Sequence, residues 1–218
     1  MKTIYNKFDK TEIADLPLES FPGRIVIIDN EQDCIKATSY LQQFDILGID
    51  TETRPSFHKG IYHKVALLQI STENEAFLFR LNHIGLPQSI IALFESNIKK
   101  IGLSLRDDIH MMTQRHSFTP NNFIDLQQIA GDIGIEDKAL QTLYANLFHL
   151  KISKRQRLSN WEAKVLTRAQ QLYAATDAWA CIILYKEIMR LKQTHDYKLI
   201  LNTTDVPVGA DHSQSSQD

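Results

Sequence analysis

Cysteine is scarce in this sequence. The 218 residues include only two, Cys34 and Cys181, which lie far apart and in segments that we expect to be helical. No Cys or Cys/His cluster has the spacing of a structural zinc site. We therefore expect two buried free thiols rather than a disulfide, which fits a reducing compartment.

A surplus of positive charge is missing as well. The chain has 24 Lys and Arg residues against 26 Asp and Glu, a formal net charge of −2. Any site for a polyanion must therefore be a local patch rather than a field over the whole surface. The sequence also lacks a membrane-spanning apolar run and the apolar core of a signal peptide. These absences predict a soluble, cytoplasmic protein with no membrane partner.

What is present fits ordinary globular composition. The apolar fraction is 43% and the charged fraction 23%, and the length suits one substantial α/β domain. We divide the chain into a lead-in segment, 1–22, a main domain, 23–195, and a C-terminal tail, 196–218. The tail is expected to be largely disordered, because residues 203–218 are polar and have little to bury.

Strand patterns dominate the first half of the chain and helix patterns the second. Strands are expected at 24–29, 46–50, 64–71, 75–80 and 99–103, with a loop or short extended piece at 121–125. Helices are expected at 10–16, 31–43, 89–96, 106–116, 125–133, 139–148, 160–165 and 167–194. The consecutive strands between 46 and 80 favour antiparallel pairing. This order predicts an α/β fold, a mixed sheet flanked by helices with a helical C-terminal half.

Two carboxylates directly follow the apolar run at 46–49. Residues i and i+2 of an extended chain point to the same side, so Asp50 and Glu52 should stand together at the strand's end. Like charges at this spacing repel and raise each other's pKa unless a cation lies between them. Alternatively, the two acids are ordinary solvated residues at a strand terminus. Further acids elsewhere in the chain would favour a functional site over this interpretation.

Further acids occur on two predicted helices. Asp107 and Asp108 open the helix at 106–116, where capping and the helix dipole would also favour acids. Asp177 lies in an apolar stretch of the long helix, one turn after Tyr173. A buried aspartate needs a basic residue, capping hydrogen bonds or a metal as partner, and an ordinary salt bridge remains an alternative.

Together these positions offer four carboxylates on an α/β scaffold. Oxygen ligands without His or Cys select hard cations, meaning Mg²⁺ or Mn²⁺. Two such ions about 4 Å apart form the clamp used for in-line phosphodiester cleavage, one activating water and the other stabilising the leaving oxygen. A phenol one helical turn from Asp177, that of Tyr173, can orient this water.

Three motifs resemble those of the DEDDy 3′–5′ exonucleases. They are Asp50-x-Glu52, Asp108 six residues after Gly102, and Tyr173-x-x-x-Asp177. The likeness is closest to the Werner-helicase exonuclease domain, with ribonuclease D more distant, and it covers about residues 24–190. Further similar segments lie at 64–70, 123–127, 158–162 and 171–178.

The resemblance implies a ribonuclease-H-like fold for the domain at 23–195, two divalent cations, Mg²⁺ or Mn²⁺, and release of nucleoside 5′-monophosphates from a 3′ end. Asp50, Glu52 and Asp177 would hold the cation that activates water. Asp50 would bridge to the second cation, with Asp108 on that side, and Tyr173 would position the nucleophile.

The resemblance leaves two assignments to decide, which are the second-motif aspartate and the subgroup of the family. Asp108 is preferred to Asp107 because its spacing from Gly102 fits the family pattern. The sister subgroup carries a histidine five residues before the last acid, and Leu172 stands there in this chain. The tyrosine subgroup is therefore indicated.

Substrate contacts are expected around these motifs. The residues that could line the 3′-terminal nucleotide or bind phosphates are Thr51, Phe57, His58, Leu103, Lys154, Arg155 and Arg157. The last three belong to a basic linker that could equally be a solvated loop. Trp161, Leu67 and Gln69 are expected to be structural.

The expected partner is a nucleic acid with a single-stranded or recessed 3′ end, DNA being favoured over RNA. One alternative is a ribonuclease-D-like enzyme that processes RNA. The other is a non-catalytic nucleic-acid-binding module on the same fold, which would have lost one or more of the acids.

Overall fold

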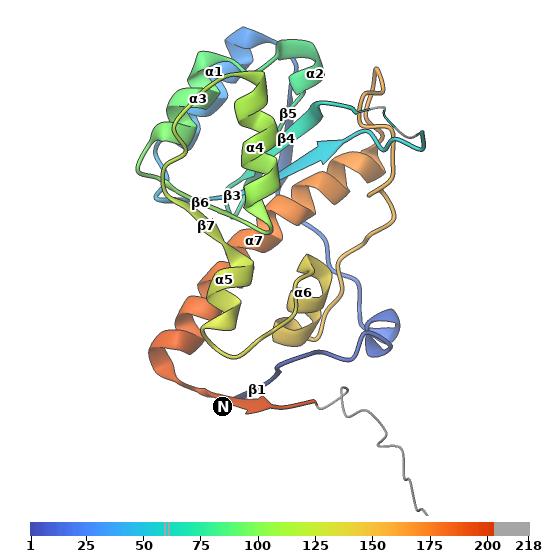
Figure 1. The fold of residues 1–218 in the computed structure, drawn as a ribbon, viewed down its shortest axis with the longest axis vertical. Helices are drawn as coiled ribbons and strands as arrows, with labels where there is room; N and C mark the ends of the chain where they lie inside the picture. Colours follow the sequence, from blue (N-terminus) through green and yellow to red (C-terminus); the bar gives the residue numbers. More distant parts are fainter. Residues whose placement is uncertain (59, 61, 203–218) are drawn as a thin grey trace, which may run out of the picture.

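The computed structural model describes residues 1–58, 60 and 62–202, and its centre is a six-stranded sheet between two layers of helices (Figure 1). The strand order is β2-β5-β4-β3-β6-β7. These strands are β2 (Arg24–Ile28), β3 (Ile46–Thr53), β4 (Val65–Ser71), β5 (Glu75–Phe79), β6 (Lys99–Gly102) and β7 (Phe123–Asp125). Strands β3 and β5 both pair antiparallel with β4, and the other neighbours are parallel. The predicted mixed sheet and its antiparallel section are confirmed.

Helices enclose the sheet from both sides. In chain order they are α1 (Glu31–Leu41), α2 (Leu81–Ile84), α3 (Gln88–Glu95), α4 (Leu105–Arg115), α5 (Leu126–Gly131), α6 (Leu140–Phe148) and α7 (Arg168–Thr194). Helices α1, α3 and α4 pack around apolar side chains on one face, including Leu47 and Ile49 of β3. Helix α7 crosses the opposite face, and α5 and α6 pack against it (Figure 1). Strand β3, in the interior of the sheet, is therefore covered on both faces.

Helix α7 begins at a capping box. The Thr167 side chain accepts a hydrogen bond from the Gln170 backbone N–H, and the Gln170 side chain accepts one from the Thr167 backbone N–H. These reciprocal bonds satisfy two donors that a helix start would otherwise leave unpaired. They fix the register from which Tyr173 and Asp177 point toward the sheet.

The flanking segments pair with each other. Strand β1 (Lys2–Tyr5) runs parallel to β8 (Tyr197–Ile200), and Ile4 between them is fully buried. The start of the segment assigned to the tail is therefore a strand, and part of the lead-in belongs to the core. A pairing between segments so distant in the chain leaves no local pattern in the sequence. The disorder expected for 203–218 lies outside the described residues.

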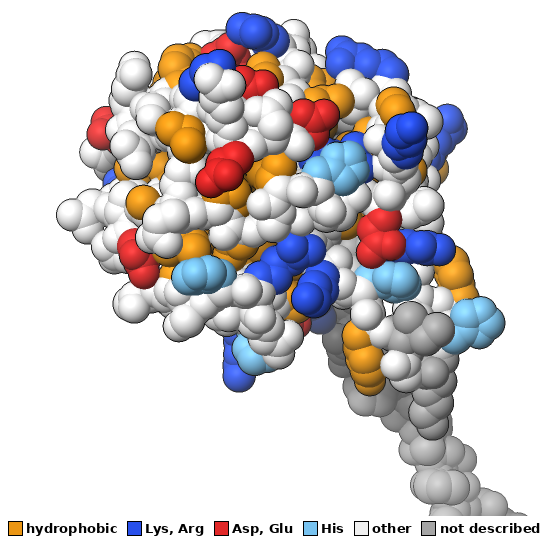
Figure 2. Space-filling model, turned by 90° about the horizontal axis from the view of Figure 1, so that it is seen from above, with side chains coloured by type: hydrophobic (Ala, Val, Ile, Leu, Met, Phe, Trp, Pro, Cys, Tyr) orange, Lys and Arg blue, Asp and Glu red, His pale blue; other side chains and the backbone are white. Residues whose placement is uncertain are grey.

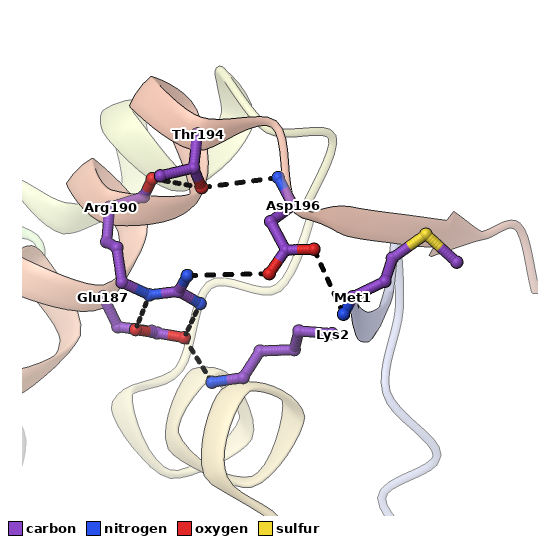
Figure 3. A network of polar contacts seen from close by, with 6 residues as sticks. All are labelled: Met1, Lys2, Glu187, Arg190, Thr194 and Asp196. Carbon is purple, nitrogen blue, oxygen red and sulfur yellow. Dashed lines mark hydrogen bonds and ion pairs between the residues drawn. The ribbon is translucent and has the colours of Figure 1, made fainter.

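Polar contacts fasten this strand pair to the end of α7 (Figure 3). Arg190 and Lys2 both donate to Glu187, and the N-terminal ammonium lies 3.1 Å from Asp196. The hydrogen bonds from Arg190, and then the one from Lys2, lower the pKa of Glu187 to about 2. Both ends of the described chain are thereby attached to the helix that carries Asp177.

Some predicted elements differ from those observed. The helix predicted at 160–165 is wrong, because these residues form turns. The Asn160 side chain accepts the Glu162 backbone N–H at 3.1 Å, a local bond that competes with helix formation. Strand β3 continues to Thr53, so the two acids lie inside the strand rather than at its end. The short helix expected at 10–16 is the 3₁₀ helix η1 (Glu12–Asp15).

Other general expectations agree with the structure. Cys34 and Cys181 are both free and buried. Lys and Arg side chains are interspersed with Asp and Glu on the face seen in Figure 2, as the near-neutral net charge predicts. Within residues 1–58, 60 and 62–202, no helix has the length and apolar character needed to cross a membrane.

Candidate active site

Three carboxylates meet between the sheet and α7. One oxygen each from Asp50, Glu52 and Asp177 can be chosen so that all three lie within 4.8 Å of one another. Asp50 and Glu52 stand on the same face of β3, as their spacing predicted, and Asp177 faces them from α7. Glu52 is 8% exposed and Asp177 is 7% exposed, whereas Asp50 keeps somewhat more accessible surface.

A close approach of β3 to α7 brings the acids together. A Cβ atom on Gly48 would lie 2.0 Å from the Ala178 carbonyl oxygen, so no larger residue fits without moving the helix. The helix contributes Ala178 to this contact, and Ala174, Ala175 and Ala178 are all fully buried. Small residues on both elements therefore set the distance between the two sources of carboxylate.

Burial raises the pKa values of all three acids, and repulsion adds to this effect for Asp50 and Glu52. Burial acts most strongly on Asp50, whose pKa is well above its usual range, and the charges of Asp177 and Asp108 add to the effect. Burial raises the pKa of Glu52 to about 10, with repulsion from Asp50 as the next cause. It raises the pKa of Asp177 to about 7, although Tyr173 and Lys154 act in the opposite direction. The cluster therefore holds protons unless a cation compensates its charge.

The donor set fits a hard divalent cation. It consists of carboxylate oxygens alone, without His or Cys, which suits Mg²⁺ or Mn²⁺ rather than zinc. In the described part of the chain, no Lys or Arg forms an ion pair with Asp50, Glu52 or Asp177. The alternative of an ordinary salt bridge for Asp177 is thus wrong, and the charge is left for a cation to balance.

Asp108 lies beside this cluster on the other face of β3. Its carboxylate accepts a hydrogen bond from the Thr51 hydroxyl at 2.5 Å, whereas Asp107 is exposed. Burial raises the pKa of Asp108 to about 6, partly offset by the bond from Thr51. Asp108 is not one of the three carboxylates within 4.8 Å. Its charge nevertheless raises the pKa of Asp50, so the two carboxylates are electrostatically coupled.

Asp125 holds the turn that aims Asp108 at β3. It ends β7, and its carboxylate accepts the backbone N–H groups of Ser104 at 3.2 Å and Leu105 at 3.0 Å. Ser104 has a left-handed backbone with φ of 57°, which turns the chain from β6 into α4. These bonds satisfy donors at the start of α4 in place of a local cap. The sequence offers no sign of this role, because the cap comes from another strand.

Tyr173 lies at the edge of the cluster, one helical turn before Asp177. Its side chain is 8% exposed, and the ring packs against Trp161 with centroids 6.0 Å apart. Burial first, and then the charge of Asp177, raises the pKa of the Tyr173 hydroxyl far above its usual range. The hydroxyl therefore stays protonated and can donate a hydrogen bond next to the acids. Trp161 is fully buried, which confirms its structural assignment.

A family model described as 3′-5′ exonuclease matches residues 25–192. The chain belongs to this 3′-5′ exonuclease family. Membership confirms the expectation of a nuclease, a hydrolase of nucleic acid, and the acidic cluster lies inside the matched range.

Individual 3′-5′ exonucleases resemble the chain over most of its length. It is 32% identical to "3′-5′ exonuclease" from Arabidopsis thaliana, over 87% of this chain and 72% of that protein. It is 30% identical to "Bifunctional 3′-5′ exonuclease/ATP-dependent helicase WRN" from Mus musculus, over 83% of this chain. The match spans only 14% of the mouse protein.

Crystal structures of exonuclease domains share the fold. The Aedes aegypti Nibbler EXO domain superposes with a TM-score of 0.73 at 20% identity, over 81% of this chain and 93% of that one. Escherichia coli RNase D superposes with a TM-score of 0.71 at 19% identity, over 78% of this chain and 45% of that one. The ribonuclease-H-like fold expected of this exonuclease is confirmed.

The residues proposed for substrate contact divide into two groups. Lys154 and Arg157 are exposed and lie near the acids, since the charge of Lys154 lowers the pKa of Asp177 and that of Arg157 lowers the pKa of Glu52. Arg155 lies beside them and lines a pocket of about 260 Å³ together with Tyr173. The basic linker therefore borders the site rather than projecting away from it.

The other proposed contacts are Phe57, His58, Leu103 and Thr51, and of these only Thr51 bonds to one of the acids. Phe57 is 80% exposed and His58 is exposed, in the loop after β3. Among the described residues, no hydrogen bond or ion pair joins either one to the acids. Leu103, directly after β6, is partly buried and packs against the core. Thr51 is occupied by its bond to Asp108.

Gln69 lies at the site, although the sequence predicted only a structural role for it. It stands directly opposite Asp50 in the β3–β4 ladder, so the two side chains share a face of the sheet. Gln69 is 0% exposed, and neither side-chain polar atom has a hydrogen-bond partner among the described residues. Only the register of the two strands reveals this juxtaposition with Asp50.

Proposed function

We propose that this family member hydrolyses nucleic acid from the 3′ end by a two-metal mechanism and releases nucleoside 5′-monophosphates, with DNA preferred to RNA. The observation that carries the proposal is the meeting of Asp50, Glu52 and Asp177 within 4.8 Å. These carboxylates form no ion pair among the described residues, their charges repel one another, and divalent cations would remove that repulsion.

The acids would divide between two ions. Asp50, Glu52 and Asp177 would hold the first, and Asp50 would bridge to the second, with Asp108 on that side directly or through water. When bound, such ions lower the pKa of water and stabilise charge on the attacking and leaving oxygens. Thr51 would hold the Asp108 carboxylate in place through its hydrogen bond.

Tyr173 would position the attacking water. Because its pKa is raised, the phenol remains protonated and cannot serve as the base that removes the water's proton. It can fix the direction of attack by hydrogen bonding. Water then adds to phosphorus, the P–O3′ bond breaks, and the upstream strand leaves with a new 3′ hydroxyl.

The basic linker would hold the phosphates near the scissile bond. Lys154 and Arg157 lie close enough to influence Asp177 and Glu52, and Arg155 adjoins Tyr173. Phe57, His58 and Leu103 would border the terminal nucleotide. A Trypanosoma brucei RNase D of this fold is described in complex with RNA U12, which supports a nucleic-acid partner here and keeps an RNA substrate as the alternative.

The direct experiment is digestion of 5′-labelled oligonucleotides. Single-stranded and 3′-recessed DNA and RNA are incubated with Mg²⁺, with Mn²⁺ and with EDTA. We expect a ladder that shortens from the 3′ end only with metal, nucleoside 5′-monophosphate as product, and faster digestion of DNA. Failure to shorten any substrate in Mn²⁺ would refute the proposal, and faster RNA digestion would favour the ribonuclease-D-like alternative.

Matched aspartate variants control this assay. Asp108→Asn should reduce digestion strongly, whereas Asp107→Asn should not, because Asp107 is exposed and Asp108 binds Thr51 beside the cluster. Metal-independent binding without digestion would support the non-catalytic module. The presence of all four acids argues against that module.

A further inference from the structure

A groove of about 430 Å³ lies beside the basic linker, between η1 and α6. Its charged lining residues are Lys10, Lys151 and Lys154, and its remaining lining residues are uncharged. Three lysines around one depression, with no acid in its wall, create a strong local positive potential on a chain of net charge −2.

Lys154 is the residue that relates the groove to the candidate active site. This lysine lines the groove, and its charge also lowers the pKa of Asp177. Burial lowers the pKa of Lys154, and repulsion from Arg157 and then from Lys10 adds to the effect. Lys154 thus lines the groove together with Lys10 and lies close enough to Asp177 to affect its pKa. A row of positive charge leads from the acidic cluster into the groove.

The lysines of the groove are not neutralised by neighbouring acids. In the described part of the chain, no ion pair involves Lys10, Lys151 or Lys154. Lys151 donates to the Ala14 carbonyl, which holds its stem against η1 without consuming its charge. The charge of Lys10 lowers the pKa of the buried Asp137, but Asp137 does not line this groove. Three positive charges gathered in one groove favour binding of a polyanionic ligand.

We propose that this groove binds the phosphate backbone of the single strand on the 5′ side of the scissile phosphate. The inference rests on the proposed function, because a 3′ end held at the acids leaves its upstream nucleotides to follow the row of lysines. The wall contains no aromatic side chain on which a base could stack. Recognition is therefore of phosphate charge, and the groove does not discriminate between bases.

The charge pattern also limits the length of strand that is bound. The adjoining depression beyond Lys10 is lined by Asp9, Glu12 and Asp137 as well as by lysines. These acids repel a phosphate backbone and end the favourable track. The affinity for oligonucleotides should therefore rise over the first few nucleotides and then level off.

The test compares substrates with and without upstream nucleotides. Thymidine 5′-monophosphate p-nitrophenyl ester requires only the acidic cluster, whereas a single-stranded decamer also reaches the groove. Lys10→Glu is the variant of choice, because Lys10 is exposed and outside the catalytic machinery. Lys99→Glu is the matched control, since Lys99 is exposed at the start of β6 and away from the groove.

We expect Lys10→Glu to raise KM for the decamer about tenfold at low salt, with kcat and ester hydrolysis unchanged. The slope of log affinity against log salt should become shallower by about one for Lys10→Ala. Lys99→Glu should leave KM within about twofold. An unchanged KM for Lys10→Glu, or an equal change in ester hydrolysis, would overturn the inference.

Binding measured in EDTA keeps this result separate from catalysis. Fluorescence anisotropy of a labelled decamer should show the same tenfold weakening for Lys10→Glu, and a labelled dinucleotide should show none. A wild-type protein that cleaves neither substrate would refute the proposed function. The binding measurement would still show whether the groove binds the strand. Equal decamer affinity for wild type and Lys10→Glu would refute the groove alone.

Discussion

Gly48 on β3 lies so close to Ala178 on α7 that a Cβ on residue 48 would stand 2.0 Å from the Ala178 carbonyl oxygen. Asp50 follows Gly48 by two residues, and Asp177 directly precedes Ala178. The contact that excludes a side chain therefore also sets the separation of the two carboxylates. Backbone packing and the geometry of the site depend on the same pair of residues.

Gly48→Ala should destabilise the protein by at least about 2 kcal/mol, because β3 and α7 must move apart. The same movement separates Asp50 from Asp177, so activity should fall more than about tenfold. Denaturant unfolding and decamer digestion measure the two effects. Gly131→Ala is the control: a Cβ there meets nothing within 4 Å, and its stability should be unchanged or slightly higher. Equal behaviour of the two variants would disprove the role of the close approach.

Asp50→Asn should stabilise the protein in EDTA while it reduces activity at least about 100-fold. The substitution nearly preserves shape, and it removes a carboxyl group that without a cation must either carry a charge beside two other acids or hold a proton above its ordinary pKa. Thermal unfolding in EDTA, followed by digestion in Mn²⁺, tests both statements. Asp107→Asn, at an exposed acid, should change neither quantity. A large loss of stability in Asp50→Asn would show that Asp50 has a structural partner instead.

The metal-free protein should lose stability as the pH rises from about 4 to about 7. Burial raises the pKa of Asp108 to about 6 and that of Asp177 to about 7, above the values of the unfolded chain. The folded state then binds more protons than the unfolded state, so the free energy of unfolding falls through this window. Melting temperatures measured between pH 5 and 8 in EDTA test the sign.

Two comparisons show whether the cluster causes this pH dependence. Saturating Mg²⁺ should flatten or reverse the fall, because the cations replace the protons on the carboxylates. Asp177→Asn should make the fall shallower in EDTA, since it removes one of the raised groups. A melting temperature that rises with pH in EDTA over pH 5–7 would contradict the electrostatic account.

Tyr173→Phe should lower kcat about 100-fold and leave Mn²⁺ affinity within about twofold. The phenylalanine keeps the packing on Trp161, whose ring centroid is 6.0 Å away, so stability should change little. Single-turnover digestion and calorimetric Mn²⁺ titration separate the two quantities. Tyr185→Phe, on the same helix and similarly buried, serves as the control. Unchanged kcat in Tyr173→Phe would remove Tyr173 from the mechanism.

Local spacing explains which parts of the site could be predicted. Asp50 and Glu52 share a face because strands repeat every two residues, and Tyr173 lies beside Asp177 because helices bring i and i+4 together. Both relationships are contained in short segments. The strand and helix order likewise followed from apolar periodicity, which identified the mixed sheet.

Features that depend on distant segments were not predictable from this sequence. The Asp125 cap on α4 joins β7 to another element, and the pairing of β1 with β8 joins the two ends of the described chain. Gln69 is set against Asp50 only by the register of β3 and β4. A helix was expected at 160–165, but the hydrogen bond that the Asn160 side chain accepts from the Glu162 backbone and the burial of Trp161 favour turns.

Anomalous diffraction from crystals soaked in Mn²⁺ and a nucleoside 5′-monophosphate tests the central claim most directly. The account predicts two peaks about 4 Å apart. Asp50, Glu52 and Asp177 should contact one peak, and Asp50 should reach the other, with Asp108 beside it. An absence of peaks at Asp50 under saturating Mn²⁺, or peaks only at other carboxylates, would contradict the account.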